Sequence, residues 1–154
     1  MRAGDLSTLV LTLWLTSAAA AQTNDEIMMW ALGEVGGELQ VCSAYFGVCS
    51  HCIKAQRPDL AITYEQAADR TATLALSSQR AAGMSDKAFL AQDAYYTKAM
   101  MGAMNENCSN IQVLLNKYSN FCQQLSRDAD PRLKAWIACI RAGQQTCGGP
   151  GLPE

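Results

Sequence analysis

The chain has 154 residues, and its 12 lysines and arginines nearly balance 14 aspartates and glutamates, which leaves a formal net charge of −2. This length corresponds to one ordinary domain. The charge balance argues against a nucleic-acid partner, because binding to phosphates needs a concentrated surface of lysine and arginine. No segment after residue 21 has an apolar run long enough to cross a membrane.

The first 21 residues have the pattern of an export signal. A short start with Arg2 precedes an apolar run at residues 6–15 (LSTLVLTLWL), which is too short to span a bilayer. Small residues at 18–21 (AAAA) then suit a signal peptidase. We predict a signal peptide over residues 1–21, cleaved after Ala21 or, alternatively, after Ala20. The product should be soluble and periplasmic or secreted; an uncleaved anchor is the alternative.

All seven cysteines follow the predicted cleavage site. An exported chain of this size with so many cysteines is expected to form disulfides. Because seven is odd, at least one is left over, and sequence alone does not assign the pairs. The candidates are Cys42, Cys49, Cys52, Cys108, Cys122, Cys139 and Cys147.

The pattern of apolar residues predicts an all-α fold, since no apolar–polar alternation typical of a strand continues for more than a few residues. We expect residues 22–143 to form a disulfide-stapled antiparallel bundle of four helices, one of them long. Residues 144–154, rich in glycine and proline, should be a flexible tail.

The first helix is predicted over residues 25–55. Two adjacent apolar stripes should be buried, and small residues face the opposite side, which is either solvated or packed closely against another helix. The first stripe is Val35, Leu39, Cys42, Phe46, Cys49 and Ile53; the second is Val41, Tyr45, Val48 and Cys52; the small residues are Gly36, Ser43, Gly47 and Ser50.

Pro58 is expected to interrupt the helical pattern, and residues 63–66 (TYEQ) have the spacing of a capping box. We therefore predict a second helix over residues 64–82, ended by Gly83. Ser85 should cap the third helix.

The third helix is predicted over residues 86–126, because an alternating 4-3 spacing of mainly apolar residues continues through it. A break at residues 105–110 (NENCSN), which would give five helices, is the alternative. The predicted buried stripe is Leu90, Ala94, Thr97, Met101, Met104, Cys108, Ile111, Leu115, Tyr118, Cys122 and Leu125.

A last helix is predicted over residues 131–142, with Asp130 as its cap and Pro131 at its first position. Its apolar side consists of Leu133, Trp136, Ile137 and Ile140.

Several segments resemble a type of uncharacterised exported helical protein of proteobacteria. They are residues 109–118 (SNIQVLLNKY), the cysteine at 122, residues 130–136 (DPRLKAW) and residues 42–46 (CSAYF). The resemblance covers much of the mature chain. It implies a bacterial, all-helical exported protein and brings no catalytic residues.

The run Cys49-Ser-His-Cys52 raises the question of redox or metal chemistry. A thioredoxin-like pair lies at a helix N-terminus after a strand, whereas this pair should lie near the C-terminal end of a helix. Haem attachment requires histidine directly after the second cysteine, and position 53 is isoleucine. On a regular helix His51 points away from both cysteines, so we predict an exposed residue rather than a ligand.

Other chemistries have weaker support. Met28, Met29, Met100, Met101 and Met104 could suit copper, but methionines at helical spacing more often fill a core. With one histidine, the chain offers neither an arguable Ser-His-Asp set nor two Glu-x-x-His pairs for di-iron. Acid pairs such as Glu34 and Glu38 are expected to be solvated.

We therefore expect the cysteines to join helices, with Cys122 bonded to Cys42 or Cys49, or with Cys108 taking its place. Cys139 and Cys147 could pair locally. The leading hypothesis is a non-enzymatic exported protein without cofactor or metal, which binds or supports a partner such as another envelope protein. The alternative is a thiol-redox or soft-metal (copper or zinc) protein that uses Cys49 and Cys52.

Overall fold

The computed structural model describes residues 23–144 and 147–148. These residues contain no strand, which agrees with the predicted all-helical class. The predicted signal peptide and residues 145–146 and 149–154 of the predicted tail lie outside the described residues. The elements are α1 (Asn24–Ile53), α2 (Pro58–Ala81), α3 (Asp86–Ala103), the short 3-10 helix η1 (Cys108–Asn110), α4 (Gln112–Arg127) and α5 (Asp130–Arg141).

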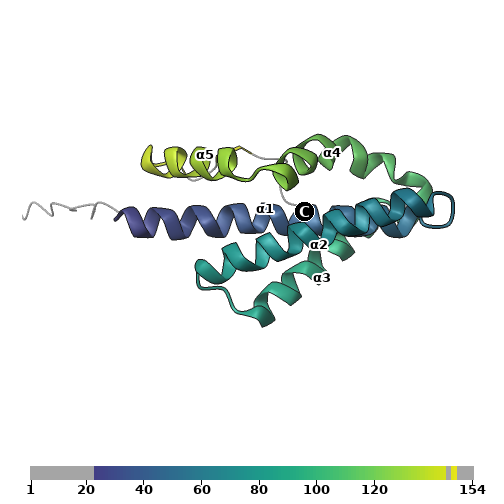
Figure 1. Cartoon of the computed structure of the whole chain (residues 1–154), viewed down its shortest axis with the longest axis horizontal. Coiled ribbons are helices and arrows are strands. Elements are labelled where there is room, and N and C mark those ends of the chain that lie inside the picture. The colour runs from purple at the N-terminus through teal and green to yellow at the C-terminus, as the bar shows by residue number, and fades with distance from the viewer. Residues whose placement is uncertain (1–22, 145–146, 149–154) are drawn as a thin grey trace, which may run out of the picture.

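The longest helix, α1, runs through the length of the molecule (Figure 1). The helices α4 and α5 lie along one side of it, and α2 and α3 lie along the other. The chain turns after α1, so that α2 returns beside it; α5 lies beside the N-terminal half of α1, where Arg141 donates to Asn24. All the other elements contact α1, which is therefore the centre of the core.

The sequence around α1 accounts for both its start and its burial. The hydroxyl of Thr23 accepts from the amide of Glu26, whose carboxylate accepts from the amide of Thr23 in a capping box. Both predicted apolar stripes are buried, except that Ile53 is only partly buried. From Leu39 to Phe46 every residue is buried, because neighbours surround the helix there.

The small residues of α1 provide a close-packing face toward α2. The hydroxyls of Ser43 and Ser50 donate to backbone carbonyls of α2, at Ala68 and Ala61 respectively. At Gly36 the two helices come so close that a β-carbon would lie 2.6 Å from Cγ of Gln79. Of the four predicted small residues, only Gly47 is exposed. The close-packing alternative is therefore correct for the other three.

The predicted start of the second helix is wrong. The helix α2 begins at Pro58, because proline is well suited to the first helical turn and the chain resumes its helix immediately after the break. Thr63 lies inside α2, where its hydroxyl donates to the carbonyl of Asp59 rather than forming a capping box. The end is as predicted: Gly83 has a φ of +88°, and Ser85 caps α3 by accepting from Ala88.

The single long helix over residues 86–126 is also wrong, and the alternative break is correct. The backbone adopts the left-handed conformation at Asn105 and Glu106, both with φ of 54°. Two asparagine side chains replace the helical hydrogen bonds there: Asn107 accepts from Ser109, and Asn110 donates to the carbonyl of Met104.

The break also changes which residues of the third segment are buried. In α3 the buried side chains are Phe89, Tyr96 and Met100, whereas the predicted Leu90 is 66% exposed. A shift of one residue corresponds to about 100° around a helix, so the predicted stripe of α3 faces the wrong way. From Ile111 onward the predicted stripe is buried or partly buried.

The start of α5 differs in its cap. Asp130 is the first helical residue rather than the cap, and its amide donates to the carboxylate of Asp128. The predicted apolar side of α5 is correct, since Trp136 and Ile140 are buried and Leu133 and Ile137 are partly buried.

The two glycines Gly36 and Gly47 form a matched pair for testing the close approach. Gly36→Ala should lower the free energy of unfolding by about 1–3 kcal/mol, because the new methyl group meets Gln79. Gly47→Ala meets nothing within 4 Å and should raise it by about 0.5–1 kcal/mol through helix propensity. Urea denaturation measures both, and equal effects at the two positions would contradict the close approach.

Candidate functional site

Three disulfides join the described residues. One connects α1 to α4. In it Cys122 is bonded to Cys42, one of the two partners expected for Cys122. A second connects the end of α1 to η1, and the third closes the expected local loop after α5. They are Cys42–Cys122, Cys52–Cys108 and Cys139–Cys147, with Cα–Cα distances of 5.2, 5.1 and 5.8 Å.

Cys49 is the free cysteine of the described residues and is buried. Burial raises the pKa of its thiol to about 12, so the reactive thiolate is scarce at neutral pH. The structure does not combine Cys49 with Cys52 as a dithiol, because Cys52 is bonded to Cys108.

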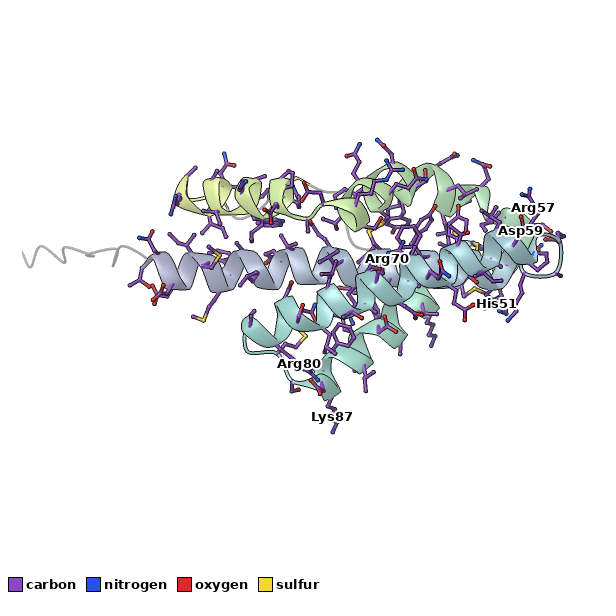
Figure 2. The ribbon with its side chains drawn as sticks, viewed as in Figure 1. His51, Arg57, Asp59, Arg70, Arg80 and Lys87 are labelled. Carbon is purple, nitrogen blue, oxygen red and sulfur yellow. A yellow bond between two sulfur atoms is a disulfide. The ribbon has the colours of Figure 1, made fainter. Side chains whose placement is uncertain are left out.

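The other candidate ligands are spread through the molecule. His51 is exposed near the turn between α1 and α2 (Figure 2). Met100 and Met104 are buried in the core, whereas Met28 and Met29 are exposed on the first turns of α1. Among the described residues, no three side chains from histidine, cysteine, aspartate and glutamate are grouped so as to hold a metal ion.

A groove of about 1020 Å³ lies beside the N-terminal half of α1. One face of α1, where Gly33 and Gly37 leave space, forms its base, and α5 and the α2–α3 corner form its sides. Its apolar lining consists mainly of Met29, Trp30, Val41, Met84, Phe121 and Trp136. Its side-chain polar groups include those of Glu34, Glu38, Gln79, Gln92 and Tyr96.

A chain of amide hydrogen bonds joins three helices beside the groove, and Gln79, the last residue of this chain, lines it. Nε2 of Gln40 donates to the carbonyl of Phe89 at 2.6 Å, and Nε2 of Gln79 donates to Oε1 of Gln40 at 3.1 Å. The first bond uses Nε2 of Gln40 as its donor, so Oε1 of Gln40 is the atom that accepts from Gln79. Oε1 of Gln79 is therefore the last atom of this chain of hydrogen bonds. That oxygen is buried and has no partner.

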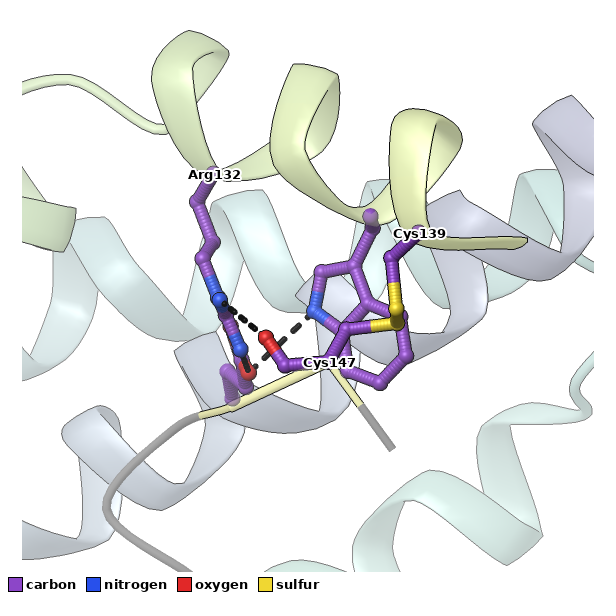
Figure 3. Close-up of polar contacts among 5 residues, drawn as sticks. Arg132, Cys139 and Cys147 are labelled. Carbon is purple, nitrogen blue, oxygen red and sulfur yellow. Dashed lines mark hydrogen bonds and ion pairs between the residues drawn. A yellow bond between two sulfur atoms is a disulfide. The ribbon is translucent and has the colours of Figure 1, made fainter. Parts of the chain in front are cut away.

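A largely buried ion pair between Arg132 and Glu38 holds α5 against α1 (Figure 3). The guanidinium of Arg132 binds both carboxylate oxygens of Glu38 and donates to the carbonyl of Cys147 at 3.0 Å. It also lies 5.3 Å from the centre of the Trp136 ring, whose indole N–H donates to Glu38 at 3.2 Å. The expectation that Glu38 is solvated is therefore wrong, because α5 supplies both a cation and an indole donor.

Sequence reasoning missed most of the groove. The buried glutamines Gln40 and Gln79 lie in helices whose apolar patterns give no signal for them. The one available clue was Gly36, whose expected close packing marks the region where Gln79 contacts α1.

No described helix is long and apolar enough to cross a membrane.

Comparisons with protein-family models, curated proteins and solved structures find no match to this chain.

We predict that Cys49 is protected by the fold. A pKa of about 12 against an ordinary 9.0 means roughly a thousandfold less thiolate at neutral pH. Brief alkylation should add no label to the native protein, one label after unfolding without reduction, and seven after reduction. Intact mass spectrometry counts the labels, and rapid labelling of the native protein would contradict the burial of Cys49.

The ion pair gives a further prediction. Arg132→Leu should lower the free energy of unfolding by about 3 kcal/mol, since it leaves the largely buried Glu38 carboxylate without its cation. Adding Glu38→Gln should recover part of this loss by removing the buried charge. The exposed Arg70 on α2 provides the control, and Arg70→Leu should change stability by less than about 0.5 kcal/mol. Equal losses for Arg132→Leu and Arg70→Leu would show that the pair contributes little.

Proposed function

We propose that this protein is an exported, non-enzymatic binding protein that takes an apolar ligand in the groove beside α1. The observation that supports this proposal is the groove itself. Its volume of about 1020 Å³ and its mainly apolar lining with few polar groups match the usual character of small-molecule sites.

Export has two sources of support. Three disulfides are typical of proteins that fold in an oxidising compartment outside the cytoplasm. The pattern of residues 1–21 and the resemblance to exported proteobacterial proteins agree with this, and we propose the periplasm or the extracellular space as the location.

We further propose that the helices form a disulfide-stapled antiparallel bundle around α1. Contacts with α5 support this direction: Arg132 pairs with Glu38, whereas Arg141, later in the chain, reaches Asn24, earlier in the chain. The same reversal applies to α2, because Ala61 contacts Ser50 and Gln79 contacts Gln40.

The geometry favours binding over thiol or soft-metal chemistry. A thiol site would need Cys49 and Cys52 together, yet the first is buried and the second is bonded to Cys108. The polar side chains around the groove offer amides, carboxylates, the Tyr96 hydroxyl and indole N–H groups. Such groups can orient a ligand without reacting with it.

The uncharged fluorescent probe N-phenyl-1-naphthylamine tests this proposal on protein that begins at residue 22. We expect saturable binding of one probe per chain, because the groove offers one apolar cavity of suitable size. Gly37→Leu should weaken binding at least about tenfold by filling the groove, since Gly37 lines it.

Gly47→Leu is the matched control, because it makes the same change on an open side of α1. Both variants should remain as helical as the parent by circular dichroism. If the probe does not bind, or if both variants bind it equally well, the groove is not the binding site.

A further inference from the structure

The carboxylate of Glu34 lies at the groove without a cation. One of its oxygens accepts from the indole N–H of Trp30 at 3.1 Å, which leaves the other oxygen for a ligand. Among the described residues Glu34 forms no ion pair, and no lysine, arginine or histidine lines the groove. The groove therefore carries an uncompensated negative charge beside an aromatic ring.

The next turn of α1 shows how this kind of site holds a cation. Glu38 also accepts from an indole N–H, that of Trp136, and there the guanidinium of Arg132 binds the carboxylate and lies over the ring. The pairs Glu34–Trp30 and Glu38–Trp136 thus combine the same two groups. The protein supplies a cation for only one of them.

The buried amides add a second, independent observation. Gln79 is 1% exposed and lines the groove, and its Oε1 has no hydrogen-bond donor. Gln92 lines the groove from α3, and its buried Oε1 also lacks a donor, while its Nε2 donates to Tyr96. Both unpartnered atoms are acceptors, which favours a ligand whose polar end carries positive charge or N–H groups.

The hydroxyl of Tyr96 lies in the same electrostatic environment. Burial chiefly raises its pKa, and the negative charge of Glu34 adds to the increase.

We infer that the groove selects amphiphilic organic cations, with the positive group at Glu34 and Trp30 and the apolar body along the walls. This inference rests on the proposed function. A cation next to a carboxylate and over an indole ring gains both Coulomb and cation–π attraction, and the apolar lining removes the rest of the ligand from water. An anionic amphiphile of the same length would face Glu34 and two unpartnered carbonyl oxygens.

Three ten-carbon probes of different charge test this selectivity: decyltrimethylammonium, decanol and decanoate, each used below its micelle concentration. The quaternary ammonium keeps its charge at every pH. Both tryptophans of the protein that begins at residue 22, Trp30 and Trp136, line the groove, so intrinsic fluorescence reports binding there. We expect the cation to bind at least about tenfold more tightly than decanol, and decanoate to bind most weakly.

Glu34→Gln should abolish the preference for the cation over decanol, because the amide can still accept from Trp30 but carries no charge. The control is Glu65→Gln, which removes an exposed charge on α2 outside the groove and should retain the preference. Circular dichroism verifies that both variants are folded.

The possible failures are distinguishable. If N-phenyl-1-naphthylamine binds but the three ten-carbon probes bind equally, the groove is a binding site without charge selectivity, and the inference is wrong. If no probe binds, the proposed function fails too. If the protein is a dimer that Gly37→Leu dissociates in analytical ultracentrifugation, a second copy occupies the groove and the inference is overturned.

Discussion

The close contact between α1 and α2 at Gly36 determines the geometry of the whole groove region. It brings Gln79 against α1, where its amide reaches Gln40, and Gln40 in turn holds the carbonyl of Phe89. Three helices are thereby joined through two buried hydrogen bonds. A buried amide costs free energy unless it is hydrogen-bonded. Few other placements of the Gln40 and Gln79 side chains would therefore keep these amides paired. The unpaired oxygen at the end of these bonds is the exception, and it belongs to a residue that lines the groove.

The two ends of α1 have different roles. Cys42 and Cys52, in its C-terminal half, are bonded to α4 and η1, and in the same half the buried ring of Tyr45 contacts that of Tyr118 on α4. The N-terminal half has no disulfide of its own and is flanked by the groove. Cross-links restrict the unfolded chain and so stabilise the fold, which allows the other half of α1 to leave a cavity partly unfilled.

The wall of the groove at α5 depends on the contacts that Arg132 makes with three of the lining residues. Arg132 neutralises Glu38, shields part of Trp136 and binds the carbonyl of Cys147. The disulfide between Cys139 and Cys147 keeps that carbonyl within reach of α5. A cation is thus already bound to Glu38 behind one wall of the groove, and Glu34, one turn earlier on α1, also accepts from an indole N–H, at a more exposed position.

Local sequence patterns were sufficient for the helical class, the extent and burial of α1, the C-terminal stop at Gly83 and the apolar side of α5, because these depend on helical periodicity and on backbone preferences of single residues. Tertiary structure decided the rest. The helix ends near Asn105 because asparagine side chains can satisfy the backbone there, and the direction in which α3 faces depends on its packing against α1. Likewise, the environments of Glu38 and Gln40 depend on Arg132 and Phe89, which are 94 and 49 residues away in sequence. Whether a polar side chain is solvated or paired is set by the neighbours that the fold brings to it, and no local pattern contains that information.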